Sequence, residues 1–289
     1  MSKRLTALVA VVLILAAGCG PKEDLGPQEV LEKSVKAMDK LDRFAVSTQV
    51  KLEQDLSPQT NQTLIEFDAE VMLNPLTMHQ LRIIRQEAEN KMSKSEMYVS
   101  EEGMFMYEPD LDQWLTLPRD MFEQMMEMED IHTNPGEHLE DLSTMTDDFH
   151  FMEDDSGYRI ELSTTEKKFQ SFLIELIPHE WLEPVKGEET AKHIALKRIT
   201  FGIEIDKDTF RQTSLDIYAD FSINMDEQTI PVQQTIHTVY RAFNDVPDIT
   251  IPDEVIENAE DFFGDDIELN DLEQIDEMNA EERENSADQ

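Results

Sequence analysis

Residues 199–225 read ITFGIEIDKDTFRQTSLDIYADFSINM. On either side of the central DKDT, apolar residues alternate with polar ones, and this period of two is typical of a β-strand with one buried face. Aspartate and threonine favour turns, because their short side chains form hydrogen bonds with nearby backbone groups. The stretch therefore predicts a long antiparallel hairpin with a polar turn at residues 206–209.

The same alternation extends over most of the chain, and the gaps between alternating segments are short. Further strands are predicted at residues 44–52, 65–73, 76–86, 96–100, 104–107, 113–117, 158–162 and 231–243. Helical spacing of apolar residues predicts helices at residues 29–41, 120–129 and 166–177. Consecutive strands without intervening helices favour antiparallel pairing. The predicted fold class is α+β, a single domain with a large antiparallel sheet and a few helices.

The N-terminus has the order of an export signal. Lys3 and Arg4 precede an apolar run over residues 5–17, which is followed by Gly18 and Cys19, the one cysteine of the sequence. The run is too short for a bilayer, since a helix needs about 20 residues to cross roughly 30 Å of hydrocarbon. We expect a signal peptide at residues 1–18 and a tether at residues 19–28. The alternatives are a signal that ends at a cysteine by chance and an uncleaved anchor, and both would export the chain.

The segment LAAGC, residues 15–19, resembles the lipobox of bacterial lipoproteins, although Ala16 stands where leucine is commonest. The resemblance implies that the thiol of Cys19, a good nucleophile, receives a lipid before cleavage. Two or three acyl chains such as palmitate hold a protein firmly at a membrane, where a single chain binds only marginally. The expected location is the extracytoplasmic face of a bacterial cell membrane, with the N-terminal lipid as the anchor.

The chain carries 64 aspartates and glutamates against 24 lysines and arginines, a net charge of −40. This charge argues against nucleic acid as a direct ligand, because phosphate recognition depends on lysine and arginine. Acidic residues are dense near the C-terminus, where apolar residues thin out. We therefore predict a folded domain at residues 29–255 and an acidic, largely disordered tail at residues 256–289. The alternative for the tail is an arm that binds a cation or a partner.

The sequence shows no motif of a known catalytic or metal site. It contains no nucleophile elbow, phosphate loop or dinucleotide fingerprint. His132, Glu137 and His138 fall in one polar stretch, but their spacing matches no zinc motif. Asp206 and Asp208 begin like a calcium loop, and the residues after them lack its oxygen ligands. The sequence predicts a non-enzyme without a cofactor or a metal, and it identifies no protein partner.

The order of these features resembles the LolA and LppX-like lipoproteins, including related lipoproteins of Gram-positive bacteria. The resemblance rests on the lipobox, the opening helix, residues 97–107 followed by Trp114, the turn at residues 206–209 and the closing residues 249–252. It implies a strongly curved antiparallel sheet, a half-barrel wrapped around helices, with an apolar cavity between them. It also implies a lipid or an acyl chain as the ligand. The extreme acidity and the tail of this chain depart from the family, so a shared fold need not mean a shared ligand.

The implied cavity would be lined by aromatic and methionine side chains. Methionine is flexible and polarizable, which suits a surface that accommodates varied ligands. The candidate lining residues are Phe67, Met104, Phe105, Trp114, Met121, Met125, Met126, Phe169, Phe172, Phe201 and Phe221. The simpler interpretation is that these side chains fill an ordinary core.

Two functional hypotheses follow. The first is a membrane-anchored, non-catalytic module that binds an apolar or amphipathic ligand in the cavity, with residues 120–148 controlling access to it. The second is a cell-surface sensor or protein-interaction module that has the same fold and a filled core. A bound apolar molecule would support the first hypothesis. A protein partner, together with a core that holds no ligand and is filled by its own side chains, would support the second.

Overall fold

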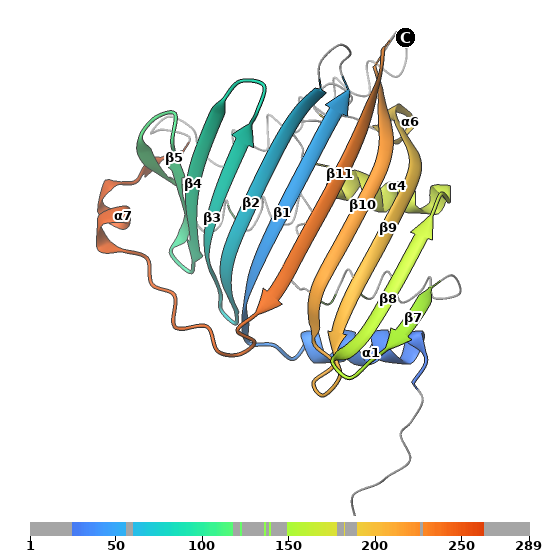
Figure 1. Cartoon of the computed structure of the whole chain (residues 1–289). Helices are drawn as coiled ribbons and strands as arrows, with labels where there is room; N and C mark the ends of the chain where they lie inside the picture. Colours follow the sequence, from blue (N-terminus) through green and yellow to red (C-terminus); the bar gives the residue numbers. More distant parts are fainter. Residues whose placement is uncertain are drawn as a thin grey trace, which may run out of the picture.

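One large sheet dominates the molecule (Figure 1). The computed structural model describes residues 25–55, 60–117, 122, 136, 139, 149–177, 182, 190–225 and 228–262. The strands are β1 (Arg43–Asp55), β2 (Thr60–Leu73), β3 (Leu76–Gln86), β4 (Lys91–Ser100), β5 (Gly103–Glu108), β6 (Gln113–Leu117), β7 (His150–Glu153), β8 (Gly157–Thr164), β9 (Ile194–Asp206), β10 (Gln212–Met225), β11 (Gln228–Arg241) and β12 (Glu260–Asp261). The helical elements are α1 (Pro27–Met38), η3 (Lys167–Phe169), α4 (Gln170–Leu176), α6 (Thr190–His193) and α7 (Asp253–Asn258).

The sheet consists of two antiparallel meanders that meet in its middle. Its strand order is β12-β6-β5-β4-β3-β2-β1-β11-β10-β9-β8-β7, so β1 to β6 and β7 to β11 each follow chain order. The meanders join where β1 pairs with β11, from Ala45 opposite Arg241 to Gln54 opposite Val232. Among the described strands, β12 forms the one parallel pair, with β6. The predicted α+β class with a large antiparallel sheet is confirmed.

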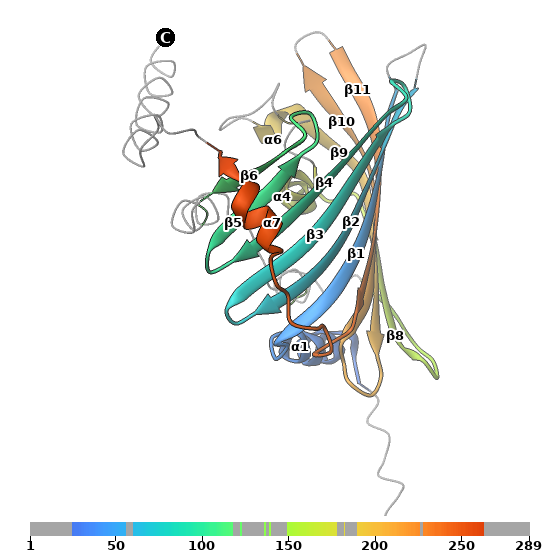
Figure 2. The same ribbon diagram turned by 90° about the vertical axis from the view of Figure 1, so that its left-hand side faces the viewer.

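The sheet is curved, and α1 and α4 lie against the same side of it, which we call the inner face (Figure 2). Side chains alternate between the two faces along each strand, and cross-strand pairs therefore share a face. One row of paired, buried residues crosses five strands on the inner face: Val50, Ile236, Ile217, Phe201 and Leu162. This row forms the centre of the main hydrophobic core.

Helix α1 closes one end of this core. It begins at Pro27, whose fixed φ angle suits the first turn and whose missing N–H is not needed there. Val30, Leu31 and Met38 recur at helical spacing and are fully buried in the main core. The amphipathic opening helix that the sequence predicts is therefore confirmed, two residues earlier than its predicted start.

The predicted hairpin is also confirmed, as β9 and β10. At its turn, Asp206 Oδ1 accepts hydrogen bonds from the Thr209 hydroxyl at 2.6 Å and from the Thr209 amide at 2.8 Å. These bonds stabilise the charged carboxylate and lower the pKa of Asp206. Asp206 and Asp208 thus act as turn residues, as the sequence indicates.

Several boundaries differ from the prediction. Strand β7 was not predicted, because HFME at residues 150–153 is short and lacks a clear alternation. The predicted helix at residues 166–177 is divided into η3 and α4. The predicted helix at residues 120–129 and the following loop lie outside the described residues, apart from Phe122, Gly136 and Leu139. The predicted signal peptide, Cys19 and most of the tether also lie outside them.

The described fold extends past Val255, where the prediction ended the domain. Val255 lies in α7 and is 3% exposed, packed with Tyr98 and Phe105. The chain then pairs with β6 as β12, and the amide of Phe262 donates to the carbonyl of Thr116 at 2.9 Å. The described structure thus continues past the predicted boundary through the end of α7 and β12 to Phe262, since a few apolar residues suffice to dock an acidic segment, and the tail beyond it stays a prediction.

Candidate functional site: the two faces of the sheet

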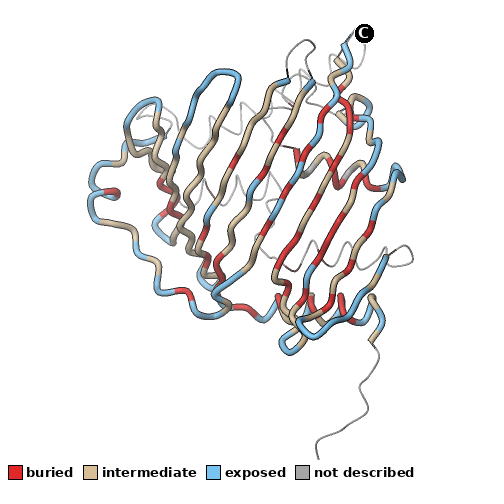
Figure 3. Tube along the Cα trace, viewed as in Figure 1, coloured by how far each residue is buried: buried red, intermediate tan, exposed pale blue. Residues whose placement is uncertain are grey.

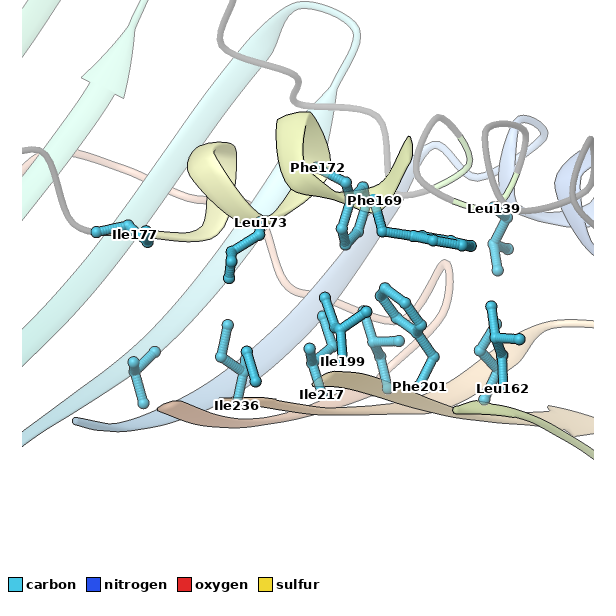
Figure 4. Close-up of a cluster of buried hydrophobic side chains, with 14 of the residues drawn as sticks. Leu139, Leu162, Phe169, Phe172, Leu173, Ile177, Ile199, Phe201, Ile217 and Ile236 are labelled. Carbon is cyan, nitrogen blue, oxygen red and sulfur yellow. The ribbon is translucent and has the colours of Figure 1, made fainter. Parts of the chain in front are cut away.

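The inner face beneath α4 is a closely packed core (Figure 4). Phe169 and Leu173 are 1% and 0% exposed and point from η3 and α4 toward the sheet. The ring of Phe201 lies 5.2 Å from that of Phe172 and 5.9 Å from that of Phe169, at angles of 69° and 41°. Such tilted and edge-on contacts are the favourable geometries for aromatic pairs. We call this region, with its strands β8 to β11, the helix-covered half of the inner face.

A side-chain hydrogen bond ties α4 to the sheet. Gln234 of β11 is 1% exposed, and its Nε2 donates to the carbonyl of Leu176 at 2.7 Å. This bond satisfies one of the carbonyls that a helix leaves unpaired at its C-terminal end. Gln234 therefore attaches the C-terminal end of α4 to the inner face of the sheet.

The inner face continues over β2 to β6, where its residues are less buried (Figure 3). Every residue of β3 is half-buried, in contrast to the alternating burial of β10. Phe67, Met78 and Ile84 face this side, and each packs against the core while remaining partly exposed. The guanidinium of Arg82 lies 5.6 Å from the ring of Phe67. We call this region the half-buried part of the inner face.

A second small core lies at the far side of this region. It consists of Val99, Met104, Leu117 and Phe122, with Met97 packed against them. Val99 pairs with both Met78 and Met104 across neighbouring strands, so this core continues the inner face. Methionine is over-represented on binding surfaces because its side chain adapts to different shapes.

The outer face carries a pocket of about 390 Å³ beside α7. Its lining residues are Lys94, Ser95, Glu96, Tyr98, Tyr107, Trp114, Pro252, Glu254 and Val255. Burial and a hydrogen bond from its hydroxyl to Glu96 Oε1 at 3.0 Å raise the pKa of Tyr98 to about 12. His79 stacks on Tyr98 with ring centroids 4.4 Å apart, and its Nε2 is 2.9 Å from the same Glu96 oxygen.

The candidate cavity residues fall into separate groups. Phe67, Phe169, Phe172, Phe201 and Phe221 belong to the main inner core. Met104 belongs to the second inner core, and Phe105 and Trp114 lie on the outer face with Val255. Met121, Met125 and Met126 lie outside the described residues.

The candidate cavity residues predicted from the sequence therefore come from both faces of the sheet. Met104 and Phe105 are consecutive in β5, and consecutive strand residues point to opposite faces, so the two side chains cannot share one cavity. The sequence analysis missed Tyr98, Tyr107 and Glu254, which line the outer pocket. Tyr98 and Glu96 are two residues apart in a predicted strand and therefore share a face, which the sequence could have shown. The approach of α7 could not be predicted, since it brings together residues that are far apart in the chain.

Within the described residues, nothing resembles a metal centre. No group of three histidine, cysteine, aspartate or glutamate side chains is placed to hold a metal ion there. His237 pairs with Asp216 across neighbouring strands, with Nδ1 and Oδ1 2.6 Å apart. His132, Glu137 and His138 are outside the described part of the chain. None of the described helices has the length and apolar character needed to cross a membrane.

These features define a class of protein with a single curved antiparallel sheet, helices on its inner face and no recognisable catalytic centre among the described residues. The chain belongs to DUF6612, a family of unknown function, and the match covers residues 26–260. A search of the curated proteins found no match.

The fold is similar to several solved structures at low identity. LprF from Mycobacterium bovis is 14% identical, with a TM-score of 0.39, over 78% of this chain and 95% of that one. A LolA-superfamily protein from Nitrosomonas europaea is 12% identical, with a TM-score of 0.22, over 80% and 97% of the two chains. A DUF1329 protein from Desulfovibrio piger is 10% identical, with a TM-score of 0.26, over 78% and 94%.

Proposed function

We propose that this protein is a non-catalytic binding module that holds an apolar or amphipathic ligand, such as a lipid acyl chain, against the half-buried part of the inner face. The observation that carries the proposal is the burial of β3. Every residue of this strand keeps partial exposure, although Ile84 and Met78 face the same side as the fully buried core of β9 and β10. An inner surface that combines apolar side chains with Gln80 and Arg82 and is only partly covered suits an amphipathic ligand.

The proposed location is the extracytoplasmic face of a bacterial membrane, with Cys19 as the lipidated residue. Its support is the LAAGC segment after a short apolar run. The described fold begins at Leu25, and α1 begins at Pro27. The few residues between Cys19 and α1 would hold the domain close to the bilayer, where an acyl chain is at hand.

Binding would be driven by removal of the acyl chain from water. Each buried methylene contributes about 0.8 kcal/mol. Loss of translational and rotational freedom opposes association by roughly 4–15 kcal/mol. The affinity should therefore rise steeply with the length of the chain, until the chain exceeds the surface that β2 to β6 provide.

A matched pair of variants in β3 tests the proposal. Ile84 faces inward opposite Ile65, and its neighbour Ile83 faces outward opposite Glu66. Both isoleucines are half-buried. We expect the chain from residue 20 to bind fluorescent fatty acids more tightly as they lengthen. I84Q should weaken this binding, and I83Q should leave it unchanged. Native mass spectrometry of the purified protein, together with analysis of its solvent extract, would show whether a lipid copurifies.

The opposite result is equally clear. A protein without a bound lipid, without fatty-acid uptake and with the same behaviour in both variants would contradict ligand binding on the inner face. The second candidate function, a surface sensor or protein-interaction module, would then be favoured. Its supporting observation is the helix-covered half, where Phe169, Leu173 and Phe201 leave the core filled.

A further inference from the structure

The outer pocket beside α7 has the composition of an aromatic cage. Tyr98 and Tyr107 come from β4 and β5, and Trp114 comes from β6. The ring of Trp114 lies 5.9 Å from that of Tyr98 and 5.6 Å from that of Tyr107, at angles of 41° and 58°. Rings tilted in this way present their faces in different directions. The three rings therefore lie side by side along the pocket, and His79 stacks on one face of Tyr98.

Two carboxylates complete the lining. Glu96 lies on the same strand and face as Tyr98, and it accepts a hydrogen bond from the Tyr98 hydroxyl. Glu254 enters from α7 and is exposed. Both carboxylates act electrostatically on the hydroxyl of Tyr98 and favour its neutral form. The pocket therefore contains two carboxylates and one ammonium group, in a chain whose net charge is −40.

The C-terminal segment supplies the remaining wall. Pro252, Glu254 and Val255 line the pocket opposite the strands. This segment is held by the burial of Val255 and by the pairing of β12 with β6. Figure 1 shows α7 beside β5, although the two elements are far apart in the sequence. The pocket forms because the C-terminal segment returns to lie beside β4 to β6.

We propose that this pocket binds an organic cation of the quaternary or alkylated ammonium class. The positive charge of such a group is spread over methyl groups, which cannot donate strong hydrogen bonds but are attracted by the faces of aromatic rings. Carboxylates at the rim supply the long-range attraction. A volume of about 390 Å³ accommodates a headgroup of this size. The inference is independent of lipid binding on the inner face, since the residues involved lie on the other side of the sheet.

Lys94 also lines the pocket, and its positive charge allows the direction of a change in cation affinity to be predicted. Its side chain is exposed, so its ammonium group can remain hydrated. A bound cation would still be repelled by it, whereas an anion would be attracted. Replacement of Lys94 and of Glu254 should therefore change cation affinity in opposite directions.

The test uses the full chain and two probes of the same shape. Choline and its neutral carbon analogue 3,3-dimethylbutan-1-ol differ chiefly in charge. We expect choline to bind in isothermal titration calorimetry, with the neutral analogue roughly tenfold weaker. Y107L should reduce choline affinity by a similar factor. E254Q should weaken it roughly threefold, and K94Q should strengthen it.

The matched control is Tyr218 of β10, which lies outside the pocket and pairs with Thr200 and Thr235. Y218L should leave choline affinity unchanged, and thermal melting of each variant would show that the fold is intact. Failure to bind choline, equal affinity for the neutral analogue, or a stronger loss in Y218L than in Y107L would overturn the proposal. Preference for a neutral sugar over choline would overturn it as well.

A second experiment distinguishes whether the cation is a lipid headgroup or a soluble compound. Vesicles of phosphatidylcholine would be compared with vesicles of phosphatidylglycerol in a sedimentation assay. Binding to phosphatidylcholine vesicles that is lost in Y107L would identify a lipid headgroup as the ligand. Binding of choline without binding to these vesicles would identify a small soluble ammonium compound. Both results require that choline itself binds and differ only in the source of the cation, and a protein that does not bind choline overturns the proposal.

Discussion

The helix-covered half and the half-buried part of the inner face differ both in sequence pattern and in burial: β10 directs apolar residues inward, whereas β3 directs Gln80 and Arg82 inward beside Ile84. In β10, the inward residues Ile217, Ala219 and Phe221 are at most 3% exposed. In β3, inward and outward residues alike are half-buried. The depth of burial therefore depends both on which residues a strand directs inward and on whether a helix such as α4 covers them. The difference indicates which region is core and which is available to a ligand.

The largest expected effect separates two phenylalanines on the same face. Phe201 is fully buried, and Phe67 is half-buried under Arg82. We expect F201A to lower the free energy of unfolding by about 3–5 kcal/mol, because it leaves a cavity that the core cannot collapse to fill. F67A should cost clearly less. Urea denaturation measures both, and equal losses would mean that the two parts are packed alike.

The second prediction tests how closely the backbones of β8 and β9 approach each other near the edge of the sheet. A Cβ added to Gly157 would lie 2.3 Å from the carbonyl oxygen of Ile205, a backbone atom on the neighbouring strand. At Gly202 the nearest atom, Cβ of Asp216, is 3.6 Å away. We expect G157A to destabilise the protein by about 1–3 kcal/mol through overpacking. In the same denaturation assay G202A should have little effect, and a reversed order would contradict the described register of β8 and β9.

The third prediction concerns the attachment of α4. Q234L removes the hydrogen bond to the carbonyl of Leu176 and should cost about 1 kcal/mol. Its neighbour Gln233 is exposed on the outer face, so Q233L is the matched control. Hydrogen exchange of the α4 amides should become faster in Q234L alone. Unchanged exchange there would show that packing of Leu173 holds the helix without this bond.

The smallest effect is a pH dependence at the β9–β10 turn. The pKa of Asp206 is lowered in the folded protein, chiefly by the Thr209 hydroxyl and amide. Its stabilising contribution is therefore present above the unfolded pKa of about 3.9 and is lost as the pH falls through the lower folded value. D206N should destabilise the protein at neutral pH, and the difference from wild type should shrink in acid. A difference that is constant from pH 7 to pH 2 would contradict this explanation.

Much of the sheet was predictable because its signal is local. The hairpin of β9 and β10, the first helix and the strands of both meanders follow from alternation, helical spacing and turn residues. Strand β7 was missed because four residues carry too little pattern. The pairing of β12 with β6 beyond residue 255 could not be predicted, because the acidic composition of this segment hides the contact.

The sequence by itself determined a strongly acidic chain, a short apolar run before its one cysteine and an antiparallel sheet with one apolar face. The tertiary structure alone decided that β1 and β11 join the two meanders, that Phe105 and Trp114 face away from Phe201, and that α7 closes a pocket on Tyr98. The physical reason is the range of the interactions. Alternation and turn propensity act between neighbours in the chain, whereas cores and pockets depend on contacts between residues that are distant in sequence.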